Sequence, residues 1–277
     1  MRLLTVAVAS LALVTSAAAQ RAPRRQASPE TAGQDWLDRC RDDSRRSRDD
    51  RERFCELRET RMSASRSLDI DGQQNGGVSV HGWDRNEVLV LAKIQTYAED
   101  GGEAKDLASD VKVEAENGRI RADGPSSLRR RSWSVSFEVW APRRTDLRIE
   151  THNGGISVED FEARLDLSAV NGGIALRGLS GDVRGETTNG PIDADLDGDR
   201  WRGTGLDLRT TNGPVTLEIP EGYSARLETG TTNGGMRIDF PITLQGSIGR
   251  RISTQLGSGG PLIRAFTTNG PVVISRR

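Results

Sequence analysis

Apolar and polar residues alternate along most of the chain after residue 67, on both sides of a recurring Asn-Gly turn. In every full copy of this pattern, the residue six positions before the Asn and the residue three positions after it are apolar. Alternation with a period of two is typical of strands that bury one face. Each copy is therefore predicted to form two short strands joined at the turn. The six full copies are centred on Asn153, Asn171, Asn189, Asn212, Asn233 and Asn269.

The spacing of the turns indicates a repeat protein. Successive Asn positions are separated by 18, 18, 23, 21 and 36 residues, and a period near 20 marks a chain built by stacking one small unit. Weaker copies at Asn75-Gly76 and Asn117-Gly118 extend the pattern toward the N-terminus. Residues 67–277 are therefore predicted to form one elongated repeat domain.

The Asn-Gly pair is expected to corner the chain with a positive φ, because Gly has no Cβ and Asn tolerates the left-handed region better than other residues. Pro191, Pro214 and Pro271 follow three of these pairs directly. Each would begin a strand, where a missing N–H disturbs the ladder least.

Two architectures fit the spacing: an antiparallel meander with Asn-Gly hairpins, and a parallel solenoid in which each repeat stacks on the last. The charges five residues before the Asn alternate in sign, as Arg148, Asp166, Arg184 and Asp207. In a parallel stack these side chains would be neighbours about 4.8 Å apart, where like charges repel. The constant Asn also favours stacking, because identical amides can hydrogen-bond in a ladder. The sequence thus favours an all-β fold, a single parallel β-solenoid of about eight coils.

The first 19 residues predict a secretory signal. Arg2 precedes an apolar run over residues 3–14, and Ala17-Ala18-Ala19 ends the segment, so cleavage is expected before Gln20. The apolar run is too short to span a bilayer, and no later segment resembles a transmembrane helix. We therefore expect the mature protein to be extracytoplasmic, in the periplasm, on the outer surface or secreted.

Residues 20–66 form a densely charged extension that holds both cysteines, Cys40 and Cys55. The i,i+4 charge pairs in residues 48–53 are compatible with a helix. On one straight helix the two cysteines would lie roughly 22 Å apart, whereas a disulfide requires Cα atoms within about 7 Å. An oxidising compartment favours a bridge, which would require the extension to fold back as a helical hairpin. The alternative is two free or intermolecular thiols.

The segment between Trp83 and Pro142 is less regular than the repeats. It contains strand-like runs at residues 88–91 and 132–139, around a helix-compatible segment at residues 104–110. We expect these to be the first coils and their cap, because terminal repeats of a stack are often atypical.

The charge of the chain gives no general reason to expect nucleic-acid binding, since 39 basic residues balance 40 acidic ones. One basic cluster, Arg129-Arg130-Arg131 with Arg143 and Arg144 nearby, is interpreted as a solvated loop rather than a contact with an anionic polymer.

No residue pattern predicts catalysis or a cofactor. The two histidines, His81 and His152, are 71 residues apart and lie near no recognisable nucleophile or metal motif. Asp193, Asp195 and Asp197 begin like a calcium loop, but the twelfth position is Thr204, where a bidentate Glu is needed. We interpret these carboxylates as a solvated row, with a weak cation site as the alternative.

Several phrases resemble the bacterial putative-adhesin domain family. They are the Thr-Thr-Asn-Gly turns, the run from Gly76 to Asp84 and the run from Phe137 to Pro142, with the Cys55–Glu59 segment before the repeats. The resemblance covers about residues 66–277. It implies a β-solenoid, secretion and no established catalytic residues.

The function expected from the sequence is that of a non-enzymatic, secreted or envelope protein that offers an adhesion or scaffold surface. Its partner would be an envelope or surface component, either polysaccharide or protein. The alternative is a carbohydrate-active solenoid enzyme, a hydrolase or lyase, with Asp193 and Asp195 or Glu159 and Asp160 as its acid/base pair. Such an enzyme needs one carboxyl group with a raised pKa.

Overall fold

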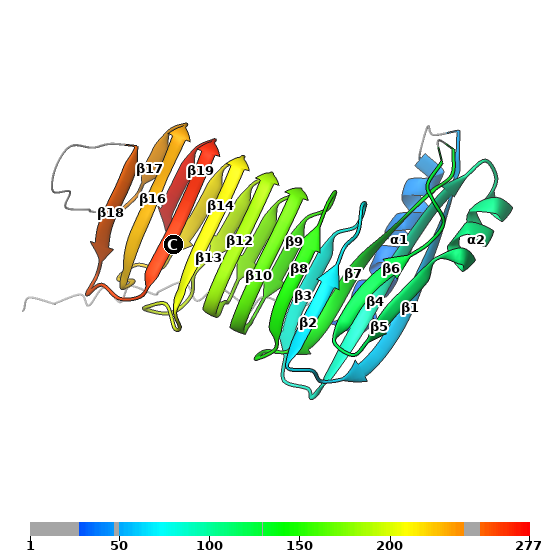
Figure 1. Cartoon of the computed structure of the whole chain (residues 1–277), viewed down its shortest axis with the longest axis horizontal. Helices are drawn as coiled ribbons and strands as arrows, with labels where there is room; N and C mark the ends of the chain where they lie inside the picture. The colour runs from blue at the N-terminus through cyan, green and yellow to red at the C-terminus, as the bar shows by residue number, and fades with distance from the viewer. Residues whose placement is uncertain (1–27, 47–49, 129, 241–249) are drawn as a thin grey trace, which may run out of the picture.

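The computed structural model describes residues 28–46, 50–128, 130–240 and 250–277. Within them, two ten-stranded sheets run along an elongated stack (Figure 1). Two helices, α1 (Pro29–Arg46) and α2 (Gly101–Asp110), lie at one end of the stack. The expected signal sequence, residues 1–19, lies outside the described residues.

The two sheets are called sheet A and sheet B. Sheet A contains, in spatial order, β1 (Glu52–Ser63), β4 (Glu87–Ala98), β7 (Ser132–Pro142), β3 (Val78–Trp83), β9 (Ile156–Glu159), β11 (Ile174–Arg177), β13 (Ile192–Asp195), β15 (Val215–Ile219), β20 (Val272–Arg276) and β17 (Met236–Ile238). Sheet B contains, in spatial order, β18 (Arg251–Leu256), β16 (Ala225–Asn233), β19 (Leu262–Asn269), β14 (Gly205–Asn212), β12 (Ser180–Asn189), β10 (Glu162–Asn171), β8 (Asp146–Thr151), β2 (Ser67–Asp71), β6 (Arg119–Asp123) and β5 (Lys112–Glu116).

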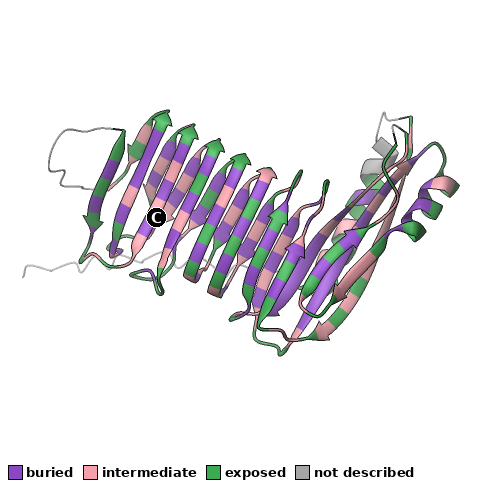
Figure 2. Cartoon of the chain, viewed as in Figure 1, coloured by how far each residue is buried: buried purple, intermediate pink, exposed green. Residues whose placement is uncertain are grey.

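Each coil consists of one strand of sheet B, an Asn-Gly corner and one strand of sheet A. Neighbouring coils pair in parallel and in register: Ile174 pairs with Ile156 on one side and Ile192 on the other. Burial alternates along the strands, and the apolar side chains of both sheets form one core between them (Figure 2). The middle of the molecule is therefore the β-solenoid-like stack that the alternating pattern predicts.

The corner of each coil is held by a ladder of asparagine side chains. Along the stack, the Nδ2 atom of each Asn after the first donates to the Oδ1 atom of the Asn in the preceding coil, at 2.8 to 3.1 Å. In spatial order the ladder runs through Asn75, Asn153, Asn171, Asn189, Asn212, Asn269 and Asn233. A buried threonine two residues before the Asn adds a second link, since Thr210 Oγ1 donates to the Gly190 carbonyl at 2.9 Å.

The prediction that the Asn-Gly pair takes a positive φ is wrong for these seven Asn residues, since the non-glycine residues with positive φ in the described chain are Gln73, Asn117 and Asp160. It is confirmed for the glycine at two corners, where Gly213 and Gly270 have φ of 154° and 156°. Close contact between coils is a second reason for glycine after Asn. A Cβ on Gly190 would lie 2.2 Å from the carbonyl oxygen of Gly172, and a Cβ on Gly172 would lie 2.1 Å from that of Gly154. Adjacent corners approach so closely that only glycine fits.

The stacking order differs from the chain order at the C-terminal end. Strand β19 pairs with β14 on one side and with β16 on the other, and β20 likewise lies between β15 and β17. The last coil of the sequence is thus inserted between the two coils that precede it. The C-terminus consequently lies on the body of the stack and not at its tip (Figure 1).

A similar insertion occurs at the other end, where β2 and β3 lie between β6/β7 and β8/β9. Pairing becomes antiparallel beyond this point, between β4 and its two neighbours and between β5 and β6. Strand β18 also pairs antiparallel with β16. A purely parallel solenoid is therefore wrong at both ends. Asn117 is not part of the ladder: with Gly118 it forms the hairpin turn between β5 and β6, and both have positive φ.

A disulfide between Cys40 and Cys55 confirms the predicted bridge, with Cα atoms 6.4 Å apart. The expected helical hairpin is wrong, because Cys55 lies in β1, which forms the edge of sheet A. Strand β1 pairs antiparallel with β4 along its whole length, from Glu52 to Ser63, so long-range pairing overrides the local helix-compatible spacing. Helix α1 covers Leu89, Leu91 and Trp140 on the outer side of sheet A.

Helix α2 closes the N-terminal end of the core. Its buried side chains are Ala104, Leu107 and Ala108, and Ala108 belongs to the main core cluster. The Asp100 carboxylate caps the helix by accepting from the Glu103 N–H at 2.8 Å. The cap expected between Trp83 and Pro142 is therefore this helix with its flanking strands.

The close approach of the corners predicts different results for two glycines in the same motif. Gly190→Ala should lower the free energy of unfolding by about 3 kcal/mol or more, because its Cβ would collide with a backbone oxygen of the next coil. Gly235→Ala is the matched control, since a Cβ there meets no atom within 4 Å, and its effect should stay within about 0.5 kcal/mol. Urea denaturation followed by circular dichroism measures both. Equal stability of the two variants would contradict the account of the corner.

Candidate functional site

The outer face of sheet B carries a row of charges that crosses the strands with alternating sign. From β5 to β16, register pairing brings charges of opposite sign beside each other on neighbouring strands. The row contains Glu116, Arg119, Asp69, Arg148, Asp166, Arg184, Asp207, Arg264 and Glu228, in spatial order. Because the last coil is inserted out of order, Arg264 separates Asp207 from Glu228, which would otherwise be like-charged neighbours.

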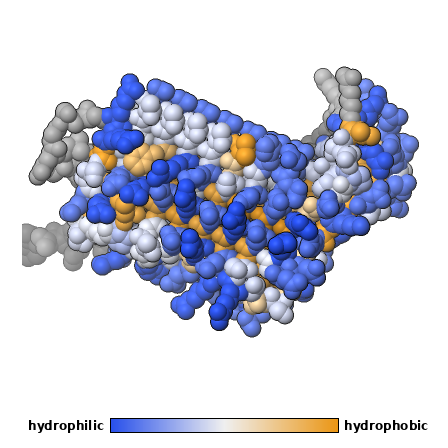
Figure 3. Space-filling model, viewed as in Figure 1, coloured by the Kyte–Doolittle hydropathy of each residue, from blue (hydrophilic) through white to orange (hydrophobic). Residues whose placement is uncertain are grey.

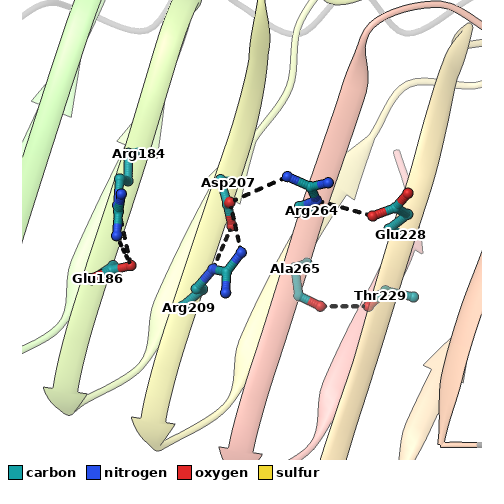
Figure 4. Close-up of polar contacts among 8 residues, drawn as sticks. All are labelled: Arg184, Glu186, Asp207, Arg209, Glu228, Thr229, Arg264 and Ala265. Atoms are coloured by element: carbon teal, nitrogen blue, oxygen red, sulfur yellow. Dashed lines mark hydrogen bonds and ion pairs between the residues drawn. The ribbon is translucent and has the colours of Figure 1, made fainter.

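The ion pairs around Arg264 are visible in Figure 4. Arg264 Nε lies 3.0 Å from Glu228 Oε2, and its Nη1 lies 3.8 Å from Asp207 Oδ2. Asp207 also accepts from Arg209 Nε at 2.9 Å. Exposed pairs of this kind each contribute little to stability, but together they neutralise this part of the face.

A groove of about 690 Å³ lies on the same face, over β12, β14, β19, β16 and β18. The central row of the groove crosses five strands. Four of its residues stand three positions before the Asn of their coil, and the fifth, on β18, is the register partner of Gly230. In spatial order the row contains Glu186, Arg209, Phe266, Gly230 and Arg251. Phe266 is half-buried and points outward in a row that is otherwise polar or small. Arg251 is exposed, and its guanidinium carbon lies 5.8 Å from the centre of the Phe266 ring.

A row of exposed threonines borders the groove on the side of the Asn ladder. These residues immediately precede the Asn of four neighbouring coils and line the groove: Thr188, Thr211, Thr268 and Thr232. The space-filling view shows a largely hydrophilic face with apolar surface between the polar side chains, part of it over β19 and β16 (Figure 3). The groove therefore combines hydroxyl groups, paired charges and one aromatic surface.

The outer face of sheet A holds a second cluster, which sequence reasoning missed. His81 of β3 lies between two carboxylates, with Nε2 3.3 Å from Glu138 Oε1 and Nδ1 3.5 Å from Glu159 Oε2. The first contact is an ion pair without the alignment of a hydrogen bond. Lys93 pairs with Glu138, and the imidazole stacks on Trp140 at 5.1 Å.

The charges of this cluster hold one another ionised. Burial lowers the pKa of His81, but the contacts with Glu138 and Glu159 outweigh it and raise the pKa to about 9. The contact with His81, with help from Arg177 and against burial, lowers the pKa of Glu159 to about 2. Burial raises the pKa of Glu138, but His81 and Lys93 outweigh it and hold that pKa below its usual range. The cluster is a compensated charge network at neutral pH.

The structure separates the residues that the sequence offered as acid/base pairs. Glu159 faces His81 and Arg177, whereas Asp160, in a positive-φ turn, contacts Arg143 at 3.5 Å. Asp195 contacts the same Arg177 at 3.3 Å, and Asp193 is exposed. Arg177 thus lies between Glu159 and Asp195. Each predicted acid/base pair therefore contains a carboxylate that contacts this arginine.

The third carboxylate of the aspartate row, Asp197, contacts Arg277. Within the described ranges, no three His, Cys, Asp or Glu side chains converge in a way that could hold a metal ion. His152 is exposed beside the Asn ladder, distant in sequence from the His81 cluster.

The predicted basic cluster lies outside the groove. Arg129 is not among the described residues. Arg130 contacts Glu99 at 3.0 Å, and Arg131 contacts Asp110 at 3.4 Å. Arg143 contacts Asp84 at 3.0 Å. These arginines pair with neighbouring carboxylates.

Neither helix in the described part of the chain is long and apolar enough to cross a membrane.

Comparison with known proteins finds a family model that matches most of the chain. The model of a family described as Toastrack DUF4097 matches residues 63–275. One similar solved structure is a putative cell adhesion protein from Clostridium sporogenes ATCC 15579, with 10% identity, a TM-score of 0.43, and coverage of 80% of this chain and 100% of that one. Another is a putative adhesin from Bacteroides fragilis NCTC 9343, with 10% identity, a TM-score of 0.38, and coverage of 80% and 97%. No curated protein matches the chain.

The His81 cluster predicts a pH-dependent contribution to stability. The folded pKa lies above the unfolded one, so the stabilisation is fully present below about pH 6.5 and is lost as the pH rises through about 9. The difference in unfolding free energy between the wild type and His81→Gln should therefore shrink by about 3 kcal/mol from pH 6 to pH 10. Urea titrations across this range measure it, with His152→Gln as the exposed control. If the difference in unfolding free energy between the wild type and His81→Gln did not change with pH, the ion pairs of His81 with Glu138 and Glu159 would be contradicted.

The charge row predicts that reversal at one position costs more than neutralisation. Arg264→Glu would place three negative charges side by side and should destabilise the protein by about 1–2 kcal/mol at low salt, roughly twice the effect of Arg264→Gln. The gap between the two variants should narrow in 1 M NaCl, where the screening length falls to about 3 Å. Thermal unfolding at two salt concentrations tests this prediction. Equal Tm values for both variants at low salt would show that residue 264 does not lie beside Asp207 and Glu228.

Proposed function

The chain belongs to the Toastrack DUF4097 family. We propose that it is a non-enzymatic, extracytoplasmic protein whose rigid β stack presents the outer face of sheet B for adhesion or scaffolding. The partner is a component of the cell envelope or surface.

The observation that carries this proposal is the regularity of the outer face of sheet B. The same positions of successive coils form rows across the sheet, because every coil is in register with its neighbours. The Asn ladder and the glycine contacts fix the spacing of these rows at about 4.8 Å. An extended partner with its own repeat can therefore contact several coils at once, so that weak contacts add up.

The disulfide supports an extracytoplasmic location. Cys40 and Cys55 tie α1 to sheet A, and such bonds persist in oxidising compartments. Together with the signal sequence expected at residues 1–19, this favours export of the chain. An adhesion surface is useful only where an external partner is within reach.

The electrostatics of the carboxylates favour binding over catalysis. A glycosidase requires a carboxylic acid that stays protonated near neutral pH. The candidate Glu159 has its pKa lowered to about 2 by His81 and Arg177, against burial, and Asp195 contacts the same arginine. The contacts of Glu159 with His81 and Arg177 stabilise its ionised form, the opposite of what a general acid needs.

Binding without turnover is the test. Purified protein spanning residues 20–277 should sediment with isolated envelopes of the source organism and leave the chain length of their polysaccharides unchanged by size-exclusion chromatography. Thr211→Tyr adds bulk to the outer face of sheet B and should reduce sedimentation at least fivefold. Thr216→Tyr adds the same bulk to the outer face of sheet A, on β15, and should not.

Shortening of the polysaccharide that is abolished by Asp195→Asn would replace this proposal with the enzymatic alternative. Equal losses of binding in Thr211→Tyr and Thr216→Tyr would remove the assignment to sheet B. Fractionation of cells that produce the tagged protein tests the location, and recovery in the cytosol would contradict it.

A further inference from the structure

We infer that the groove around Phe266 binds an acidic polysaccharide, with a sugar ring stacked on Phe266 and its carboxylate bound by Arg251. This inference rests on the proposed function, because it assigns a ligand to the same face of sheet B.

The aromatic surface of the groove is formed by three neighbouring strands. Phe266 of β19 is the register partner of Arg209 on one side and of Gly230 on the other, and Gly230 is the partner of Arg251. A Cβ at Gly230 would lie 3.0 Å from the Arg251 Cγ atom and 2.6 Å from the Arg250 carbonyl oxygen. The glycine therefore leaves space for Arg251 to extend over β16 toward the phenyl ring.

The charges of the groove single out Arg251 as the cation that is available to a ligand. Arg264 is paired with Glu228 at 3.0 Å, Arg209 with Asp207 at 2.9 Å, and Glu186 with Arg184 at 2.7 Å (Figure 4). Among the described residues, Arg251 has the Phe266 ring as its partner and no carboxylate. A carboxylate ligand would bind its guanidinium with charge-assisted hydrogen bonds and would not compete with an existing ion pair.

The remaining walls of the groove match the hydroxyl groups of a sugar. The exposed hydroxyls of Thr188, Thr211, Thr268 and Thr232 can each donate and accept. They recur at the strand spacing of about 4.8 Å along the stack, a distance similar to the length of one pyranose unit in an extended chain. A polysaccharide lying along the stack therefore meets an equivalent hydroxyl at each sugar.

Other ligands fit these residues less well. A peptide strand cannot extend the sheet within the groove, because β14, β19 and β16 are each paired on both sides within sheet B. Nucleic acid requires a field of uncompensated cations, whereas the charges on this face alternate. A neutral glycan would use Phe266 and the threonines but gain nothing from Arg251.

The experiment uses oligogalacturonate as the acidic probe and its methyl ester as the same sugar without charge, with titration calorimetry of residues 20–277. The acid should bind at least tenfold more tightly than the ester. Phe266→Leu, which keeps an apolar side chain but removes the ring, and Arg251→Gln should each weaken binding of the acid by about tenfold, which corresponds to about 1.4 kcal/mol. Arg148→Gln is the matched control and should bind normally, because Arg148 and its partner Glu150 lie on the same face but outside the groove lining.

Polyglutamate of similar length tests whether charge alone suffices. Binding of polyglutamate as tight as that of oligogalacturonate would overturn the sugar assignment. The inference would also be overturned if the acid did not bind, or if the acid and its ester bound with equal affinity. Unchanged affinity for the acid in Phe266→Leu and Arg251→Gln would overturn it as well. Thermal unfolding of each variant excludes a loss of binding through misfolding.

Envelope binding that survives in Phe266→Leu and Arg251→Gln would contradict this inference and leave the proposed function intact. Oligogalacturonate binding without envelope binding would contradict only the proposed function.

Discussion

The close contact between glycines of adjacent coils is the constraint on which the rest of the structure depends. At each corner the carbonyl oxygen of one glycine lies where a Cβ of the next would be, as between Gly172 and Gly190. The contact is possible only if the coils are in strict register, and the Asn ladder and the buried threonines hold that register. One coil cannot bury its own apolar face, so stability comes from neighbours that cover each other. Rows of equivalent side chains on both outer faces are the direct result.

The same register explains how charge and stacking order are related. Side chains at equivalent positions are nearest neighbours across strands, so their charges must alternate or repel. In chain order, Asp207 would be followed by Glu228 and then by Arg264. In the stack, Arg264 lies between the two acids and contacts both. The inserted coil also places Phe266 beside Gly230 and Arg251, so the groove exists because the last coil does not lie at the end.

The sequence predicts well what depends on local pattern. Alternating apolar residues identify the strands of the repeats, and the constant Asn indicates an amide ladder. Features that depend on distant pairing were missed. Asn117 has the same local phrase as the ladder residues but turns a hairpin, and residues around Cys55 have helical spacing but form an edge strand. The His81 cluster joins β3, β7 and β9, whose pairing no local pattern reveals. The signal for the inserted coil was present in the sequence, since only that order keeps the charges alternating.

The order of the coils can be measured directly with pairs of cysteines. Thr211 and Thr268 occupy equivalent outward positions on coils that the structure places side by side, about 4.8 Å apart, whereas Thr211 and Thr232 lie two strands apart, at about 9.6 Å. A disulfide requires Cα atoms within about 7 Å. Under mild oxidation, Thr211→Cys with Thr268→Cys should form a bond that peptide mass spectrometry detects beside Cys40–Cys55, and Thr211→Cys with Thr232→Cys should not. The reverse result would mean that the coils stack in chain order, and it would contradict the register, the charge row and the groove together.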